Sequence, residues 1–255
     1  SSWIDYNLMK SNFSLGLNIS NEFEEVYKLS TSHLSPSFSY EINLNYNWVL
    51  RSGAQFSIVD SRLNNDLVFL DQFNFDGTIG TSAENLMVYN NRNYLSLAMG
   101  MLAYSEKIWI GGSIYNLNEP NISFTNEKIN LDKLYSFHIG FKIDKFKMSP
   151  SLHFKKQSKF NQLDLGTYFN LEPINFGIWY RGIPIDSNNN FNSLISSLGI
   201  NLKDLIMSYS YDYNFSDLSD SGGSHEISII YNFNFLGKKI PPKNARFLQC
   251  PIPNF

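Results

Sequence analysis

Residues 134–155, LYSFHIGFKIDKFKMSPSLHFK, decide the fold predicted for this chain. In both halves of this stretch large apolar residues alternate with small or polar ones. The first half places at its alternate positions Tyr135, Phe137, Ile139, Phe141 and Ile143. Side chains along a β-strand point alternately to opposite faces. The stretch therefore predicts two amphipathic strands joined by a short turn at Asp144–Lys145.

The same alternation recurs through nearly the whole chain. We predict about thirteen strands by this pattern. They cover 2–9, 12–20, 34–45, 48–60, 93–104, 107–117, 134–143, 146–156, 162–170, 174–182, 192–201, 205–214 and 224–235. Such strands are about 10–12 residues long, whereas the commonest length in soluble sheets is about 5–6. Length therefore favours membrane-spanning strands over a soluble sandwich, which gives the same alternation.

Aromatic residues at the ends of the apolar runs also favour membrane-spanning strands. Rings in these positions are typical of the interfacial girdles of outer-membrane barrels. We assign to the girdles Tyr94, Tyr104, Trp109, Trp179, Tyr180, Tyr211 and Tyr213.

Composition excludes several other classes of protein. Charged residues make up 17% of the 255 residues, and the net charge of −3 gives no bulk attraction to nucleic acid. The single cysteine, Cys250, rules out an internal disulfide or a cysteine metal cluster. No run reaches the roughly 18 apolar residues of a transmembrane helix, but barrels span with strands of about 9–11 residues.

Loop lengths predict the topology. Short connections lie at 10–11, 46–47, 105–106, 144–145, 171–173 and 203–204, and longer ones at 21–33, 61–92, 118–133, 157–161, 183–191 and 215–223. Outer-membrane barrels have short periplasmic turns, longer external loops and an even number of strands. We therefore predict an all-β, antiparallel transmembrane β-barrel over residues 1–235. It would have about 14 strands, one of them encoded upstream of residue 1.

Residues 236–255 are predicted to form a periplasmic C-terminal tail. The segment contains four prolines and four cations, and proline cannot donate to a sheet ladder. Two interpretations remain open: an extended strip that docks a periplasmic partner, or a disordered chain end.

Two groups of residues are candidates for partner binding. The first lies in the long loop 61–92, whose apolar cluster either contacts a partner or forms a plug over the barrel mouth. The second lies in the late strands, where charged and aromatic groups either grip a peptide or simply line a polar interior. The candidates are Phe69, Asp71, Phe73, Phe75, Asp76, Trp179, Arg181, His225 and Glu226.

The four histidines, His33, His138, His153 and His225, do not predict catalysis. His138 and His153 fall on the polar faces of adjacent strands beside many serines. A serine hydrolase also needs a third group that orients the histidine, and no such group is identifiable. Metal-ligand spacing is absent as well. We therefore predict no enzymatic activity, no cofactor and no metal.

Several stretches resemble the PorP/SprF family of Bacteroidota outer-membrane proteins, which work with the type IX secretion system. The resemblance covers most of the chain from about residue 34, and the last hairpin is its most specific part. An upstream family strand with an Arg-x-Gln-Trp pattern is not found here. The similar stretches are DLVFLDQ at 66–72, GSIYNLNEP at 112–120, the run 149–169, FGIWYRG at 176–182, the run 208–233, and the ending 246–255 with Cys250-Pro251.

The resemblance implies a binding and assembly protein of the outer membrane. It would hold the C-terminal sorting domain of a secreted surface adhesin, as in gliding motility, or link the secretion machinery to the membrane. Its partners would be the lipid bilayer, the cargo domain and periplasmic secretion components. A transport channel for small solutes is the alternative, because a barrel of this size has room for a passage.

Overall fold

The computed structural model describes residues 1–8, 12–25, 28–63, 72–74, 76–80, 91–182, 192–215, 223–233 and 250–252. The predicted all-β, antiparallel fold is confirmed, with thirteen strands in this described part. The strands are β1 (Ser2–Leu8), β2 (Phe13–Glu24), β3 (Leu29–Asn45), β4 (Trp48–Leu63), β5 (Asn91–Tyr104), β6 (Ile108–Tyr115), β7 (Leu134–Phe141), β8 (Met148–Gln157), β9 (Phe160–Leu171), β10 (Ile174–Arg181), β11 (Ser193–Leu202), β12 (Leu205–Asn214) and β13 (Ser224–Tyr231). One 3₁₀ turn, η2 (Asp144–Phe146), precedes β8.

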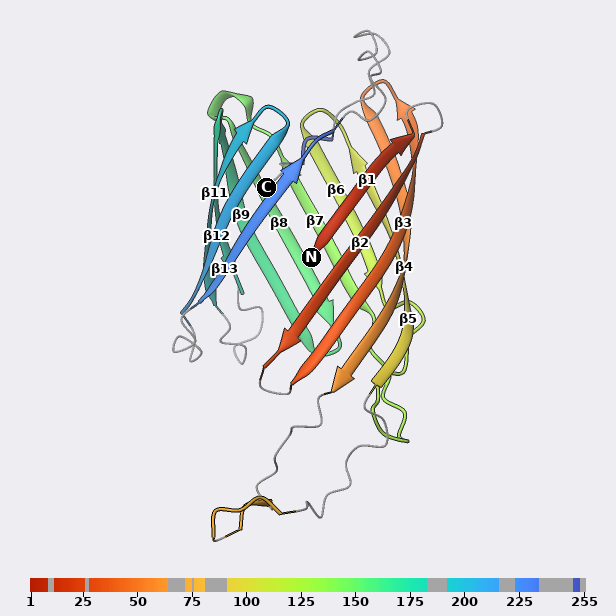
Figure 1. The fold of residues 1–255 in the computed structure, drawn as a ribbon. Coiled ribbons are helices and arrows are strands. Elements are labelled where there is room, and N and C mark those ends of the chain that lie inside the picture. Colours follow the sequence, from red (N-terminus) through yellow and green to blue (C-terminus); the bar gives the residue numbers. More distant parts are fainter. Residues whose placement is uncertain are drawn as a thin grey trace. The chain divides into compact units, whose positions relative to one another are not determined.

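The strands form one sheet in which each strand pairs with its neighbours in sequence (Figure 1). The order runs from β1 to β13 without a crossover, so β1 and β13 are the two ends of the order. Alternate connections therefore lie at the same edge of the sheet. We call the edge with the turns at 46–47, 105–107 and 203–204 the short-turn edge, and the opposite one the long-loop edge.

Two of the predicted long connections are wrong. Residues 21–33 were expected to be a loop, but β2 and β3 continue with Glu24 paired to Leu29. Both faces of this hairpin end are largely polar, so the alternation that marks strands disappears there. The expected loop 157–161 is a two-residue turn, because Gln157 pairs with Phe160.

The chain divides into two compact units. One contains Ser1–Glu41, Ser52–Gly100 and Ile114–Leu134, and the other contains Ile42–Arg51, Met101–Ser113 and Tyr135–Phe255. In the first unit, asparagines fix the connection after β6. Asn118 accepts a hydrogen bond from the amide of Leu97 at 3.0 Å and donates one to the carbonyl of Leu95 at 2.6 Å. This part of the GSIYNLNEP stretch therefore holds the loop against β5.

Residues that lie directly opposite each other on neighbouring strands share a face of the sheet. By this rule the sheet has one polar and one apolar face. In β10 to β12 the polar face carries Asn175, Ser197, Gly199 and Ser208 in register. The apolar face is exposed in both units, and exposed apolar surface of this extent marks contact with a membrane or a partner. Its residues include Leu15, Ile19, Phe38, Ile42, Leu95, Met99, Phe137, Ile139, Leu198, Ile200, Met207, Ile227 and Ile229.

The girdle assignment is wrong for four aromatic residues. Tyr94 is half-buried and shares its face of β5 with the buried Ala98, whereas Leu95 and Met99 are exposed on the other face. Tyr104 and Trp109 are buried, at 1% and 3% exposure, and Trp179 lies opposite Gly166 on the polar face. Tyr180 and Tyr213, in contrast, are exposed on the apolar face. Sequence position alone placed all of them near strand ends, but only the parity of each residue decides which face its ring occupies.

Candidate functional site

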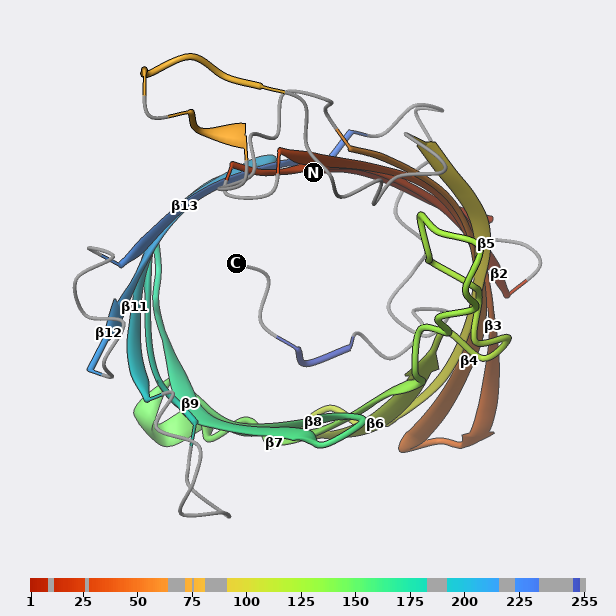
Figure 2. The same ribbon diagram turned by 90° about the horizontal axis from the view of Figure 1, so that it is seen from below.

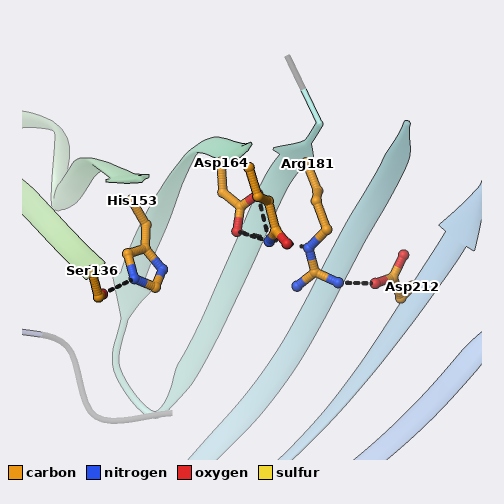
Figure 3. A network of polar contacts seen from close by, with 6 residues as sticks. Ser136, His153, Asp164, Arg181 and Asp212 are labelled. Atoms are coloured by element: carbon orange, nitrogen blue, oxygen red, sulfur yellow. Dashed lines mark hydrogen bonds and ion pairs between the residues drawn. The ribbon is translucent and has the colours of Figure 1, made fainter. Parts of the chain in front are cut away.

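Arg181 is the centre of a polar network on the polar face (Figure 3). It is the last residue of β10 and lies opposite Asp164 of β9 and Ser193 of β11. Its Nη1 donates a 2.6 Å hydrogen bond to Oδ2 of Asp212, and its Nε lies 3.7 Å from Oδ2 of Asp164. The guanidinium on β10 therefore joins β9 on one side to β12 on the other, and it crosses β11 to reach β12.

The network continues along the face to β7. Gln162 donates two hydrogen bonds to Asp164, at 3.1 and 2.9 Å. His153 of β8 lies opposite Asp164, and its Nε2 is 2.8 Å from Oγ of Ser136. The carboxylates of Asp164 and Asp212 are largely shielded from solvent, whereas the Arg181 side chain is 39% exposed. The cation is thus the part of the network that a partner can reach.

Trp179 packs on the same face, two residues before Arg181. Its indole lies over Gly166, where a β-carbon would overlap the ring, and it meets Tyr168 edge to face with ring centroids 5.2 Å apart. Glycine is required at this close approach because any side chain would displace the indole. The two aromatic rings and the arginine therefore share one face, with Arg181 at the long-loop edge and Tyr168 farther along the strands.

Glu226 and His225 lie on opposite faces of β13. Glu226 pairs with Ser210 and so shares the polar face with Arg181 and Asp212. His225 pairs with Tyr211 on the apolar face, where the Tyr209 hydroxyl and His225 Nδ1 are 2.7 Å apart. The structure therefore brings Trp179, Arg181 and Glu226 to one face and places His225 apart from them.

The loop candidates are described only in part. Phe69, Asp71 and Phe75 lie outside the described residues. Phe73 forms a β-bridge with Ile79, and both side chains are exposed, at 59% and 60%. Asp76 accepts hydrogen bonds from the amide and hydroxyl of Thr78, at 2.9 and 2.6 Å, which hold the pKa of this carboxyl below its usual range. Asp76 thus stabilises a tight turn that presents two apolar side chains.

Ser136 and His153 are of the residue types of the first two members of a hydrolase triad, and in the described part of the chain the partner found for His153 is Ser136. Asp164, the nearest carboxylate in register, is bound by Gln162 and paired with Arg181 instead. The interactions found for this carboxylate therefore stabilise the arginine and do not orient the histidine, as a triad requires. Among the described residues, no cluster of three metal-ligating side chains is found.

Asp164, Asp212 and Ser136 were not among the predicted site residues. Each has the parity of the polar face of its strand, and a search for carboxylates of that parity near Arg181 would have found two of them. Their convergence depends on strand register, which a period of two does not fix.

The site and fold together define a class of protein: a membrane protein built of β-strands, with a polar face that carries a charged network. In the part of the chain that the structure describes, no helix is long and apolar enough to cross a membrane. The family model described as type IX secretion system membrane protein PorP/SprF matches residues 2–231. The chain therefore belongs to this family, as the resemblance predicted. A comparison with curated proteins finds no match.

Proposed function

We propose that this protein is an outer-membrane barrel of the type IX secretion system that binds the C-terminal sorting domain of a secreted surface adhesin. The sheet would form the barrel wall, with its apolar face toward lipid and its polar face toward the lumen. The long-loop edge would face outside and the C-terminus the periplasm.

The observation that carries this proposal is the position of the Arg181 network. It lies at the long-loop edge beside two aromatic rings, and its guanidinium is partly exposed although it already pairs with carboxylates. Arginine and tryptophan dominate the binding energy of protein interfaces. An extended peptide would stack on Trp179, accept hydrogen bonds from the partly exposed guanidinium of Arg181 and donate to the exposed carboxylate of Glu226.

The experiment is affinity purification of the tagged protein from cells that secrete the cargo. We expect an adhesin fragment or a secretion component to copurify, and we expect Trp179→Ala with Arg181→Ala to lose the adhesin fragment. Lys155→Met, which removes a cation from β8 on the same face, serves as the matched control. Recovery of neither class of partner with the unchanged protein would overturn the proposal.

Linkage of the secretion machinery to the membrane is the second role within this proposal. It would show as a secretion component that copurifies equally with the double variant and with the unchanged protein. A steady open conductance in planar bilayers would favour the alternative, a channel for small solutes. The polar lining of serines and asparagines is equally suited to that role, so conductance discriminates the two.

A further inference from the structure

Three large side chains near the short-turn edge are almost completely buried. Val49 follows the turn at 46–47, and Tyr104 and Trp109 flank the turn at 105–107; their exposures are 0%, 1% and 3%. Trp109 lies over Gly140, where a β-carbon would overlap its ring, so it occupies the polar face. A single sheet layer cannot bury such residues by itself, so another part of the chain must cover them.

The covering segment is Cys250–Ile252. Cys250 and Ile252 pack against the cluster of Val49, Tyr104 and Trp109, as does Leu102 of β5. Figure 2 shows the described C-terminal piece, in dark blue, as a short segment that belongs to no strand. Elsewhere on this face the aromatic side chains of Tyr168 and Trp179 are only half-buried.

The connection is long enough for this contact. Tyr231, at the end of β13, pairs with Leu205 just after the turn at 203–204, so the chain leaves the sheet at the short-turn edge. From Phe233 to Cys250 an extended chain reaches on the order of 55 Å. The segment therefore starts at the same edge of the sheet as the cluster that it covers.

We propose that Val49, Leu102, Tyr104 and Trp109 form a binding site for a short apolar, proline-containing peptide, and that the natural occupant is the chain's own Cys250–Pro251–Ile252 segment. Proline fixes its own backbone angle and lacks an N–H, so an extended segment around Pro251 loses little entropy on binding. Aromatic side chains commonly bind such segments. We refer to these four residues as the tail-binding site.

The contact is small, which makes it reversible. Among the described residues of the segment, Cys250 and Ile252 pack against the cluster and are only half-buried, and ordering the backbone opposes even this burial. Release of the segment exposes an aromatic surface at the short-turn edge, on the side opposite to the Arg181 network. This inference concerns a different site from the proposed function and does not depend on it.

Cys250 allows a direct test, because it is the only cysteine. In the full-length protein folded in detergent, a maleimide should label Cys250 at least about tenfold more slowly than in the unfolded chain, as expected for a protected group. Trp109→Ala should speed labelling, whereas Ile110→Ala, on the opposite face of the same strand, should not. Ile252→Asp should also speed labelling without altering the sheet. Ile252→Leu keeps an apolar side chain at this position, so it is the matched control and should leave labelling slow.

Cross-linking provides an independent test. Val49→Cys should form a disulfide with Cys250 on mild oxidation, while Ile110→Cys should not. Rapid labelling of Cys250 in the unchanged protein, or equal labelling in the Ile252→Asp and Ile252→Leu variants, would overturn the proposal. A cross-link at position 110 and none at position 49 would overturn it as well.

Discussion

The guanidinium of Arg181 reaches across an entire strand to Asp212, donating a 2.6 Å hydrogen bond from β10 to β12. The strand between them, β11, presents the small side chain of Ser193 opposite Arg181. A larger residue there would block the path. The ion pair therefore depends on a serine that makes no charged contact itself.

Removing the arginine should destabilise the protein. Arg181→Met leaves Asp164 and Asp212 without their cation, and both carboxylates are largely shielded from solvent. Because the arginine is itself partly exposed, we expect a loss of about 1–2 kcal/mol rather than the larger cost of breaking a fully buried pair. Urea unfolding in detergent measures this change in the free energy of unfolding. A double-mutant cycle with Asp212→Asn should show coupling, and equal effects of Arg181→Met and Lys155→Met would contradict this prediction.

The glycine beneath Trp179 should not tolerate a side chain. In Gly166→Ala the new methyl group would overlap the indole, so the ring must move, and we expect a loss of about 1–3 kcal/mol. The combined variant Gly166→Ala with Trp179→Ala should recover part of this loss because the overlap is gone. Gly199→Ala is the control, since its methyl would make only ordinary contacts of 3.4 Å or more. An unaltered unfolding midpoint for Gly166→Ala would count against the packing described here.

The turn at Asp76 should depend on pH. The bonds from Thr78 lower the pKa of Asp76 in the folded loop below its ordinary value of 3.8. The carboxylate therefore stabilises the turn fully above about pH 4, and this stabilisation disappears as the pH falls through the lowered pKa. The amide resonance of Thr78 in an NMR titration reports the protonation of Asp76. Asp76→Asn should remove the transition and Thr78→Val should move it upward; an unchanged midpoint in Thr78→Val would contradict the assignment.

Charge should be tolerated on one face of β13 and not on the other. Ile227 is 74% exposed on the apolar face, and Ser228 is its neighbour on the polar face. If the apolar face contacts lipid, Ile227→Arg should cost up to about 2–4 kcal/mol, depending on its depth in the bilayer. Ser228→Arg should cost much less. The two variants are compared by their yields of folding into lipid vesicles. Similar yields would argue that this face does not contact the hydrocarbon core.

The local pattern of residues was enough to predict the strands of this protein. A period of two in residues such as Tyr135 to Phe141 is a local property, so it identified the thirteen strands of the described part and their polar and apolar faces. Family motifs in the late strands likewise led to the PorP/SprF family. Connections were less reliable, as in 21–33, because the alternation fades where both faces are polar.

Which residues meet depends on how the strands align and on the path of the chain. Strand register brought Arg181 to Asp212 and Asp164, separated His225 from Glu226, and turned Trp109 and Trp179 away from the apolar face. The contact of Cys250 and Ile252 with Tyr104 and Trp109 joins segments more than 140 residues apart. Such contacts depend on register and chain path, which a local repeat of apolar residues does not encode.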